Sequence, residues 1–235
     1  MLKFESLFMQ NISIKLFSFF ILSFFILSCR NNSEEVVLTG KEYYPIRLGE
    51  SKIYIADTFI YDDFTGKTDK RSLEFKEEIT DKLIDNAGDT FYRVELSTYN
   101  FVKLKWEIFK VIQRKLLGNY AIETIDNTAE LKLLLPISNY KTKGSSYAWN
   151  INMLNKNDAE RIKYTAVFKN FTKGTLNYND CVSIGLVNNE TGLVNNYREE
   201  VYAKNIGLVY RHIDKSNYLS STGKRAGFEI IIRLK

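Results

Sequence analysis

The chain of 235 residues carries 33 lysines and arginines against 28 aspartates and glutamates, a formal net charge of +5. Because this excess is small and the two signs alternate along the chain, we expect a mixed solvated surface and no nucleic-acid partner. The length fits one domain whose core needs no disulfide. One histidine and two cysteines are too few for a His/Cys zinc cage, and the glycines fall in no phosphate-binding spacing, so no metal or other cofactor is expected.

An apolar run over residues 16–27 stands near the N-terminus, with Lys3 and Lys15 before it. A helix of this length rises about 18 Å, well short of the roughly 30 Å hydrocarbon core of a bilayer. The run therefore predicts the core of a signal peptide better than a transmembrane span, and residues 1–28 are expected to be removed.

The run ends in Ile26-Leu27-Ser28-Cys29, which resembles a lipobox: an aliphatic residue three before the cysteine and a small residue directly before it. The resemblance implies cleavage between Ser28 and Cys29 and thioether lipidation of Cys29, so that acyl chains would hold the protein to a membrane. Two alternatives stay open, an ordinary secretory signal with an incidental cysteine and a short anchor that is never cleaved. We expect a lipid-anchored protein of the cell envelope, at the outer membrane, on its periplasmic or its surface face.

Residues 29–41 are largely polar and suit a flexible linker between the lipid and a folded body that begins at residue 42. Within this linker, Ser33, Glu34 and Glu35 resemble the acidic export signal of surface-exposed lipoproteins of the Bacteroidota. A solvated linker explains the same residues equally well, so both interpretations stay open.

Residues 42–235 read as one short strand after another, with no long segment of helical periodicity. Residues 53–61 are rich in β-branched and aromatic types, and residues 73–79 alternate between apolar and charged types as a half-buried strand should. A turn over residues 86–89 then leads into residues 91–99, which predicts a hairpin.

The next segment, residues 101–117, carries apolar residues on both faces of an extended chain and is expected to be a strand throughout. A Gly-Asn turn and a returning strand at residues 120–125 are expected to follow it. Residues 131–135 include four leucines and predict a buried strand stopped by Pro136. Residues 158–168 fit a helix or a strand, and their alternation favours the strand.

Further ordered segments are expected at residues 147–151, 181–187, 199–203, 207–213 and 228–234. Together the pattern predicts an all-β fold, a single antiparallel domain of nine to eleven strands, built as a sandwich or a (half-)barrel. Because the chain has only two prolines and none after Pro136, the later strands can pair without interruption.

Two C-terminal segments, residues 179–183 and residues 200–210 with their Tyr-Ala-Lys-x-x-Gly-Leu-Val pattern, resemble a recurring signature of uncharacterised bacterial lipoproteins. The resemblance implies adjacent strands and an envelope address, and it names no activity. Within it, Gly207 predicts a bulge or a tight bend. Cys181 lies in an alternating pattern that favours a small buried thiol over a reactive nucleophile.

The chain lacks the residues of most catalytic sites. His212, the single histidine, lies in a predicted strand and is expected to be an exposed or hydrogen-bonded residue, not a base. Adjacent carboxylates such as Glu77-Glu78 and Glu199-Glu200 point to opposite faces of a strand and cannot flank one glycosidic bond, although carboxylates of different strands could converge. An aspartate group could bind calcium but lacks an EF-hand spacing, so a solvated loop is expected: Asp57, Asp62, Asp63 and Asp69.

Trp106 and Trp149 are the candidates for a ligand-binding surface, with core packing as the alternative, and no catalytic residue is assigned. The leading hypothesis is a non-enzymatic envelope lipoprotein whose β domain binds a partner protein, a glycan or a lipid. The alternative is a carboxylate-dependent hydrolase of envelope polysaccharide. It requires two carboxyl groups from separate strands about 5 to 10 Å apart, with at least one raised pKa.

Overall fold

The computed structural model describes residues 40–137, 146–148, 161–186, 194–219 and 223–235, all within the unit Leu38–Lys235. The expected signal peptide, Ser28, Cys29 and nearly all of the expected linker lie outside these residues, and so does Trp149. Within the described ranges, the structure has no helix that is both long and apolar enough to cross a membrane.

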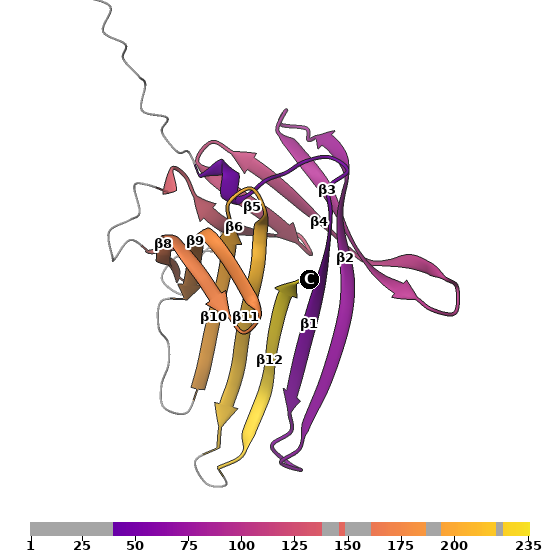
Figure 1. The fold of residues 1–235 in the computed structure, drawn as a ribbon, viewed down its shortest axis with the longest axis vertical. Helices are drawn as coiled ribbons and strands as arrows, with labels where there is room; N and C mark the ends of the chain where they lie inside the picture. The colour runs from indigo at the N-terminus through magenta and orange to yellow at the C-terminus, as the bar shows by residue number, and fades with distance from the viewer. Residues whose placement is uncertain (1–39, 138–145, 149–160, 187–193, 220–222) are drawn as a thin grey trace, which may run out of the picture. The chain divides into compact units, whose positions relative to one another are not determined.

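The described residues form one short 3-10 helix, η1 (Lys41–Tyr43), and twelve strands in a single antiparallel sheet (Figure 1). The strands are β1 (Ser51–Tyr61), β2 (Thr68–Ile84), β3 (Thr90–Asn100), β4 (Lys105–Leu117), β5 (Tyr120–Ile125), β6 (Thr128–Leu134), β7 (Ser146–Ala148), β8 (Arg161–Lys173), β9 (Leu176–Leu186), β10 (Val194–Ala203), β11 (Gly207–Tyr218) and β12 (Arg225–Leu234). The expected all-β class and single antiparallel domain are confirmed. Of the architectures left open, the structure has one continuous sheet and not two stacked sheets.

One boundary expected from the sequence is wrong. The extended segment expected over residues 101–117 begins only at Lys105, because residues 101–104 form the turn between β3 and β4. The turn contains no glycine or proline. Instead, the Asn100 side-chain oxygen accepts the N–H groups of Val102 and Lys103, each at 3.0 Å, and this local hydrogen bonding replaces the usual turn residues.

The strand order is β6-β5-β4-β3-β2-β1-β12-β11-β10-β9-β8-β7, so each half of the chain is a meander of sequential neighbours. The two meanders join where the first strand meets the last, with Tyr54 of β1 opposite Leu234 of β12. This pairing makes the sheet continuous and places the C-terminal strand at its centre.

Side chains connect the two ends of this sheet. The hydroxyl of Tyr164 in β8 accepts the N–H of Leu134 at 2.9 Å and donates to the carbonyl of the same residue at 2.8 Å, at the end of β6. The Tyr147 hydroxyl in β7 donates to the Lys132 carbonyl at 3.1 Å. Because β6 and β7 stand at opposite ends of the strand order, the sheet must curve back on itself to make these contacts. The two ends of the sheet are thus joined by hydrogen bonds from tyrosine hydroxyls and not by backbone pairing between β6 and β7.

The curvature gives the sheet an inner and an outer face. On the inner face, Glu123 of β5 lies 3.6 Å from Arg211 of β11, although five strands separate them in the sheet order. The inner core also includes Tyr43 and Tyr44 from η1 and its C-terminal flank. The outer face carries a second cluster, which consists of Cys181, Val201, Ala203, Val209 and Tyr210.

The C-terminal segments that resemble the lipoprotein signature do form adjacent strands, β9, β10 and β11. Gly207 follows the turn between β10 and β11 with a φ of 88°, and a Cβ there would lie 3.3 Å from Pro45, so the expected tight bend is present. Cys181 is 1% exposed in β9, and burial raises the pKa of its thiol, as expected of a packed and unreactive cysteine.

Candidate functional site

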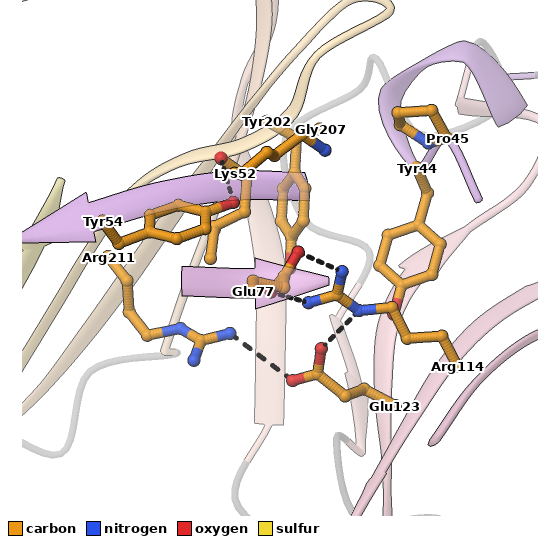
Figure 2. A pocket seen from close by; sticks show the side chains of 11 residues that line it. Tyr44, Pro45, Lys52, Tyr54, Glu77, Arg114, Glu123, Tyr202, Gly207 and Arg211 are labelled. Atoms are coloured by element: carbon orange, nitrogen blue, oxygen red, sulfur yellow. Dashed lines mark hydrogen bonds and ion pairs between the residues drawn. The ribbon is translucent and has the colours of Figure 1, made fainter. Parts of the chain in front are cut away.

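The inner face holds a buried arginine clamp. The two terminal nitrogens of Arg114 in β4 each donate to one carboxylate oxygen of Glu77 in β2 at 2.6 Å, and its Nε donates to Glu123 in β5 at 2.8 Å. Figure 2 shows the Arg114 guanidinium between these two carboxylates. Such a fork matches the planar geometry of the guanidinium to that of the carboxylate and is among the stronger protein hydrogen-bond arrangements.

The clamp continues into a larger set of charges, here called the inner ion network. Lys132 lies 2.6 Å from Glu130, 3.4 Å from Glu123 and 3.5 Å from Glu200. Glu200 also accepts from Arg198 at 2.6 Å. Counted over the described residues, the network contains four carboxylates and four cations, whose formal charges balance: Glu77, Glu123, Glu130, Glu200, Arg114, Lys132, Arg198 and Arg211.

The pKa values show which charge states the network favours. Burial acts to raise the pKa of Glu123, but the cations Lys132, Arg114 and Arg211 outweigh it and lower this pKa to about 2. For Glu200, burial again opposes ionisation, and the surrounding cations hold its pKa well below the ordinary value. Both carboxylates are therefore ionised at neutral pH.

Tyrosines enclose the network. The Tyr202 hydroxyl donates to Glu200, and the Tyr54 hydroxyl donates to the Leu208 carbonyl at 3.0 Å. The ring of Tyr44 lies under the Arg114 guanidinium, 5.8 Å from ring centroid to Cζ. Burial raises the pKa of all three phenols, so they stay protonated and available as donors.

A cavity of about 190 Å³ adjoins the network. The charged residues of its lining are Glu77, Lys110, Arg114, Glu123 and Arg211. The rest of the lining is apolar or aromatic: Tyr54, Phe75, Leu96, Ile112, Ile125, Leu208 and Ile232. We call this space the inner cavity. It exceeds an engineered cavity of about 150 Å³ that binds benzene, so its size suits a small organic molecule.

A second space, of about 10 Å³, is lined by the same Glu77–Arg114 pair together with Pro45, Lys52 and Gly207 (Figure 2). Its volume corresponds to roughly one water molecule. The inner cavity is therefore the only one of these two spaces that could hold a ligand.

Arg211 differs from Arg114 in how well its donors are used. Its Nε lies 3.0 Å from Glu200 but is buried without a hydrogen bond of acceptable geometry in the described part of the chain, and its Nη2 is 3.6 Å from Glu123. A guanidinium has five N–H groups. Because Arg211 lines the inner cavity, its guanidinium is the candidate donor for an acceptor atom placed there.

At the cavity lining the structure brings two carboxylates of separate strands together, as the hydrolase alternative requires, but the pKa of one of them is shifted in the direction opposite to that of a general acid. Glu77 of β2 and Glu123 of β5 share the cavity wall and are bridged by Arg114. A general acid needs a raised pKa, and the pKa of Glu123 is lowered.

Trp106, the described one of the two tryptophan candidates, does not line the inner cavity. It is half-buried near the start of β4, edge-on to Tyr99 at 5.5 Å between ring centroids, with the Lys76 ammonium 5.5 Å from its ring. Trp149, Ser28 and Cys29 lie outside the described residues. Trp106 is therefore the one sequence-based candidate that the described residues place, and it lies outside the inner cavity.

Other singled-out residues have structural partners. The Nε2 atom of His212 lies 2.8 Å from Glu229, so the histidine is a hydrogen-bonded strand residue. The Asp62 side chain accepts from the backbone of Phe64 and Thr65 and stabilises its own loop. No group of three or more His, Cys, Asp or Glu side chains in the described ranges is arranged to hold a metal ion.

Comparison with known proteins adds a single resemblance. No family model matches the chain, and no curated protein matches it. One solved structure, a candidate exported protein of Bacteroides fragilis described as having a YmcC-like fold, aligns over 81% of this chain and 97% of its own, at 12% identity and a TM-score of 0.36. A similarity this low carries no argument about function, which must come from the site itself.

Proposed function

We propose that this protein is a lipid-anchored envelope protein whose β domain is a non-enzymatic binding module. The ligand we propose is a small molecule with an apolar body and one uncharged polar acceptor, bound in the inner cavity. The observation that carries the proposal is the mixed lining of this cavity of about 190 Å³, to which charged and apolar side chains both contribute.

The charge balance of the inner ion network favours an uncharged head group. Within the described part of the chain, four cations already face four buried carboxylates, so an added ligand carboxylate would bring a surplus negative charge into the site. A hydroxyl or carbonyl oxygen could instead accept from Arg211 without changing the charge. The apolar walls would then bury the remaining carbon atoms at a gain of about 0.8 kcal/mol per methylene.

Binding without catalysis agrees with the state of the carboxylates. Glu123 and Glu200 are held ionised, and Arg114 occupies both oxygens of Glu77. A carboxylate in a hydrogen-bonded arginine fork is poorly suited to donate a proton or to attack a substrate carbon. These three residues therefore support a structural and ligand-orienting role.

A titration with two matched probes tests the binding proposal. We expect hexanol to bind saturably, observed by ligand NMR, and hexanoate to bind about tenfold more weakly because of its charge. Leu96→Trp places a larger side chain in the cavity lining and should abolish hexanol binding, whereas Leu83→Trp, at an exposed position of β2, should leave it intact. Absence of saturable hexanol binding, or equal binding by both variants, would overturn the proposal.

The anchor is a separate part of the proposal and rests on the lipobox-like Ile26-Leu27-Ser28-Cys29. Intact mass of the membrane-extracted protein should correspond to a chain that begins at Cys29 and carries acyl chains. Cys29→Ala should lose both the added mass and retention in the membrane fraction. An unlipidated soluble product from the unmodified chain would refute the anchor and leave the cavity proposal standing.

A further inference from the structure

The turn between β3 and β4 exposes three large apolar side chains at one point. Phe101 is 81% exposed, Val102 93% and Leu104 73%. We call these three residues the apolar tip. In Figure 1 the β3–β4 hairpin projects from the sheet at the right of the view. Exposed apolar side chains are common singly, but a group at the end of a projecting hairpin indicates a contact surface.

Hydrogen bonds hold this turn in its exposed form. Asn100 accepts from the backbone of Val102 and Lys103 through its side-chain oxygen, and its amide nitrogen donates to Glu107 at 2.8 Å. Lys103 pairs with the same Glu107 at 2.8 Å. Since both polar ends of the turn are fixed in this way, the apolar tip is presented outward by a formed structure.

Aromatic and basic residues follow the apolar tip in a definite order. Tyr99 lies edge-on to Phe101 at 5.1 Å and to Trp106 at 5.5 Å between ring centroids. Lys103 and Lys105 are exposed on either side of Leu104, and Glu107 is the one acidic residue between positions 99 and 107. The hairpin therefore passes from apolar to aromatic side chains and carries a small excess of positive charge.

This order matches the layers of a bilayer surface better than it matches a protein interface. Apolar side chains suit the acyl region, Tyr and Trp suit the interfacial region, and lysine stems can extend so that the ammonium groups reach lipid phosphates. In a protein interface the lysines beside Leu104 would be desolvated, and lysine is depleted in the centres of such interfaces.

We propose that the apolar tip inserts into the surface of a bilayer that contains anionic phospholipids. This contact is distinct from the inner cavity, since none of the three tip residues lines that cavity. It would orient the β domain on the membrane.

Tryptophan fluorescence of the full chain in vesicles tests this inference. The chain has two tryptophans, so Trp149→Phe leaves Trp106, beside the apolar tip, as the sole reporter, and Trp106→Phe gives the complementary variant. In vesicles of brominated phosphatidylglycerol we expect Trp106 emission to fall by about half, and less in brominated phosphatidylcholine. Phe101→Ser with Leu104→Ser should abolish the quenching while hexanol binding in the inner cavity is unchanged.

Two results would overturn the inference. One is equal quenching with and without the two serine substitutions, which would show that Trp106 reaches the lipid without insertion of the apolar tip. The other is protection of Trp106 from acrylamide that grows with protein concentration in the absence of vesicles, which would show that the apolar tip contacts a second copy of the chain. If Trp149→Phe does not fold, quenching is measured in the chain that keeps both tryptophans, with and without the two serine substitutions. The signal of the Trp106→Phe variant, which comes from Trp149 alone, is then subtracted to give the quenching of Trp106.

Discussion

Arg114 donates from its two terminal nitrogens to the two carboxylate oxygens of Glu77, each at 2.6 Å, across the inner face of the sheet. The two residues belong to β4 and β2 and are 8% and 6% exposed. Removing one partner of a buried ion pair costs more than the pair itself contributes, because a charge is left buried without compensation. The stability of the fold should therefore be more sensitive to this pair than to ion pairs in solvent.

Arg114→Met should lower the free energy of unfolding by about 3 to 5 kcal/mol, because it removes the fork from Glu77 and one of the cations beside Glu123. Urea denaturation measures the change. Arg71→Ala is the matched control, since Arg71 pairs with Asp69 in solvent, and it should change stability by less than about 1 kcal/mol. Similar losses in both variants would show that the buried clamp has no special role. The double substitution Arg114→Met with Glu77→Met should recover part of the loss.

The stability of the protein should fall in acid because of Glu123. Its folded pKa is about 2 against an ordinary value of 4.5, a depressed value, so its contribution is complete above pH 4.5 and is lost as pH falls towards 2. The shift corresponds to about 3 kcal/mol for this group, and Glu200 acts in the same direction. Urea midpoints between pH 7 and pH 2 measure the loss. Glu123→Gln should be less stable than the unmodified chain at pH 7, and the two plots of urea midpoint against pH should converge near pH 2. Parallel plots would show that the loss of stability in acid does not come from Glu123.

Tyr164→Phe should loosen the junction of the two sheet ends, because it deletes both hydrogen bonds to Leu134. The expected loss is about 1 to 3 kcal/mol. Amide hydrogen exchange at Leu134 should accelerate in this variant. Tyr92→Phe serves as control, since no hydrogen bond of the Tyr92 hydroxyl is found within the described ranges, and it should leave exchange at Leu134 unchanged. Equal exchange in both variants would mean that β6 is held by other contacts.

The strands were predictable because their residues alternate. Phe75, Glu77 and Ile79 are alternate residues of β2 and therefore lie on the same face of the strand. This spacing was the one indication in the sequence that a charged residue lies on the buried face. A glutamate among apolar inward positions is ambiguous, since a solvated strand face gives the same sequence. The partner decides the matter, and Arg114 is 37 residues away in the chain.

The contacts that form the site depend on the curvature of the sheet, which cannot be predicted from the alternation of residues along each strand. Glu123 reaches Arg211 only because the sheet bends past five intervening strands. Register shifts contribute to that bend, for example the one between Ala121 and Ile122 in β5. A local pattern gives the face of each residue on its own strand, but not which distant strand meets it across the sheet.

The turn at residues 101–104 was hidden for a different reason. Its apolar side chains continue the pattern of β4, so they read as a strand, while the hydrogen bonds of Asn100 make the turn. A turn made of apolar residues departs from the usual polar composition of such turns. That departure is what indicates a surface used for contact.

A crystal of the protein soaked with bromobutanol tests the central claim most directly, because the anomalous signal of bromine locates the ligand without a binding model. We predict the bromine among Phe75, Ile112 and Ile232 in the inner cavity, with the hydroxyl oxygen within hydrogen-bond distance of Arg211. Bromine found only on the outer surface, with the inner cavity collapsed or filled by side chains, would contradict the claim that this cavity is a binding site.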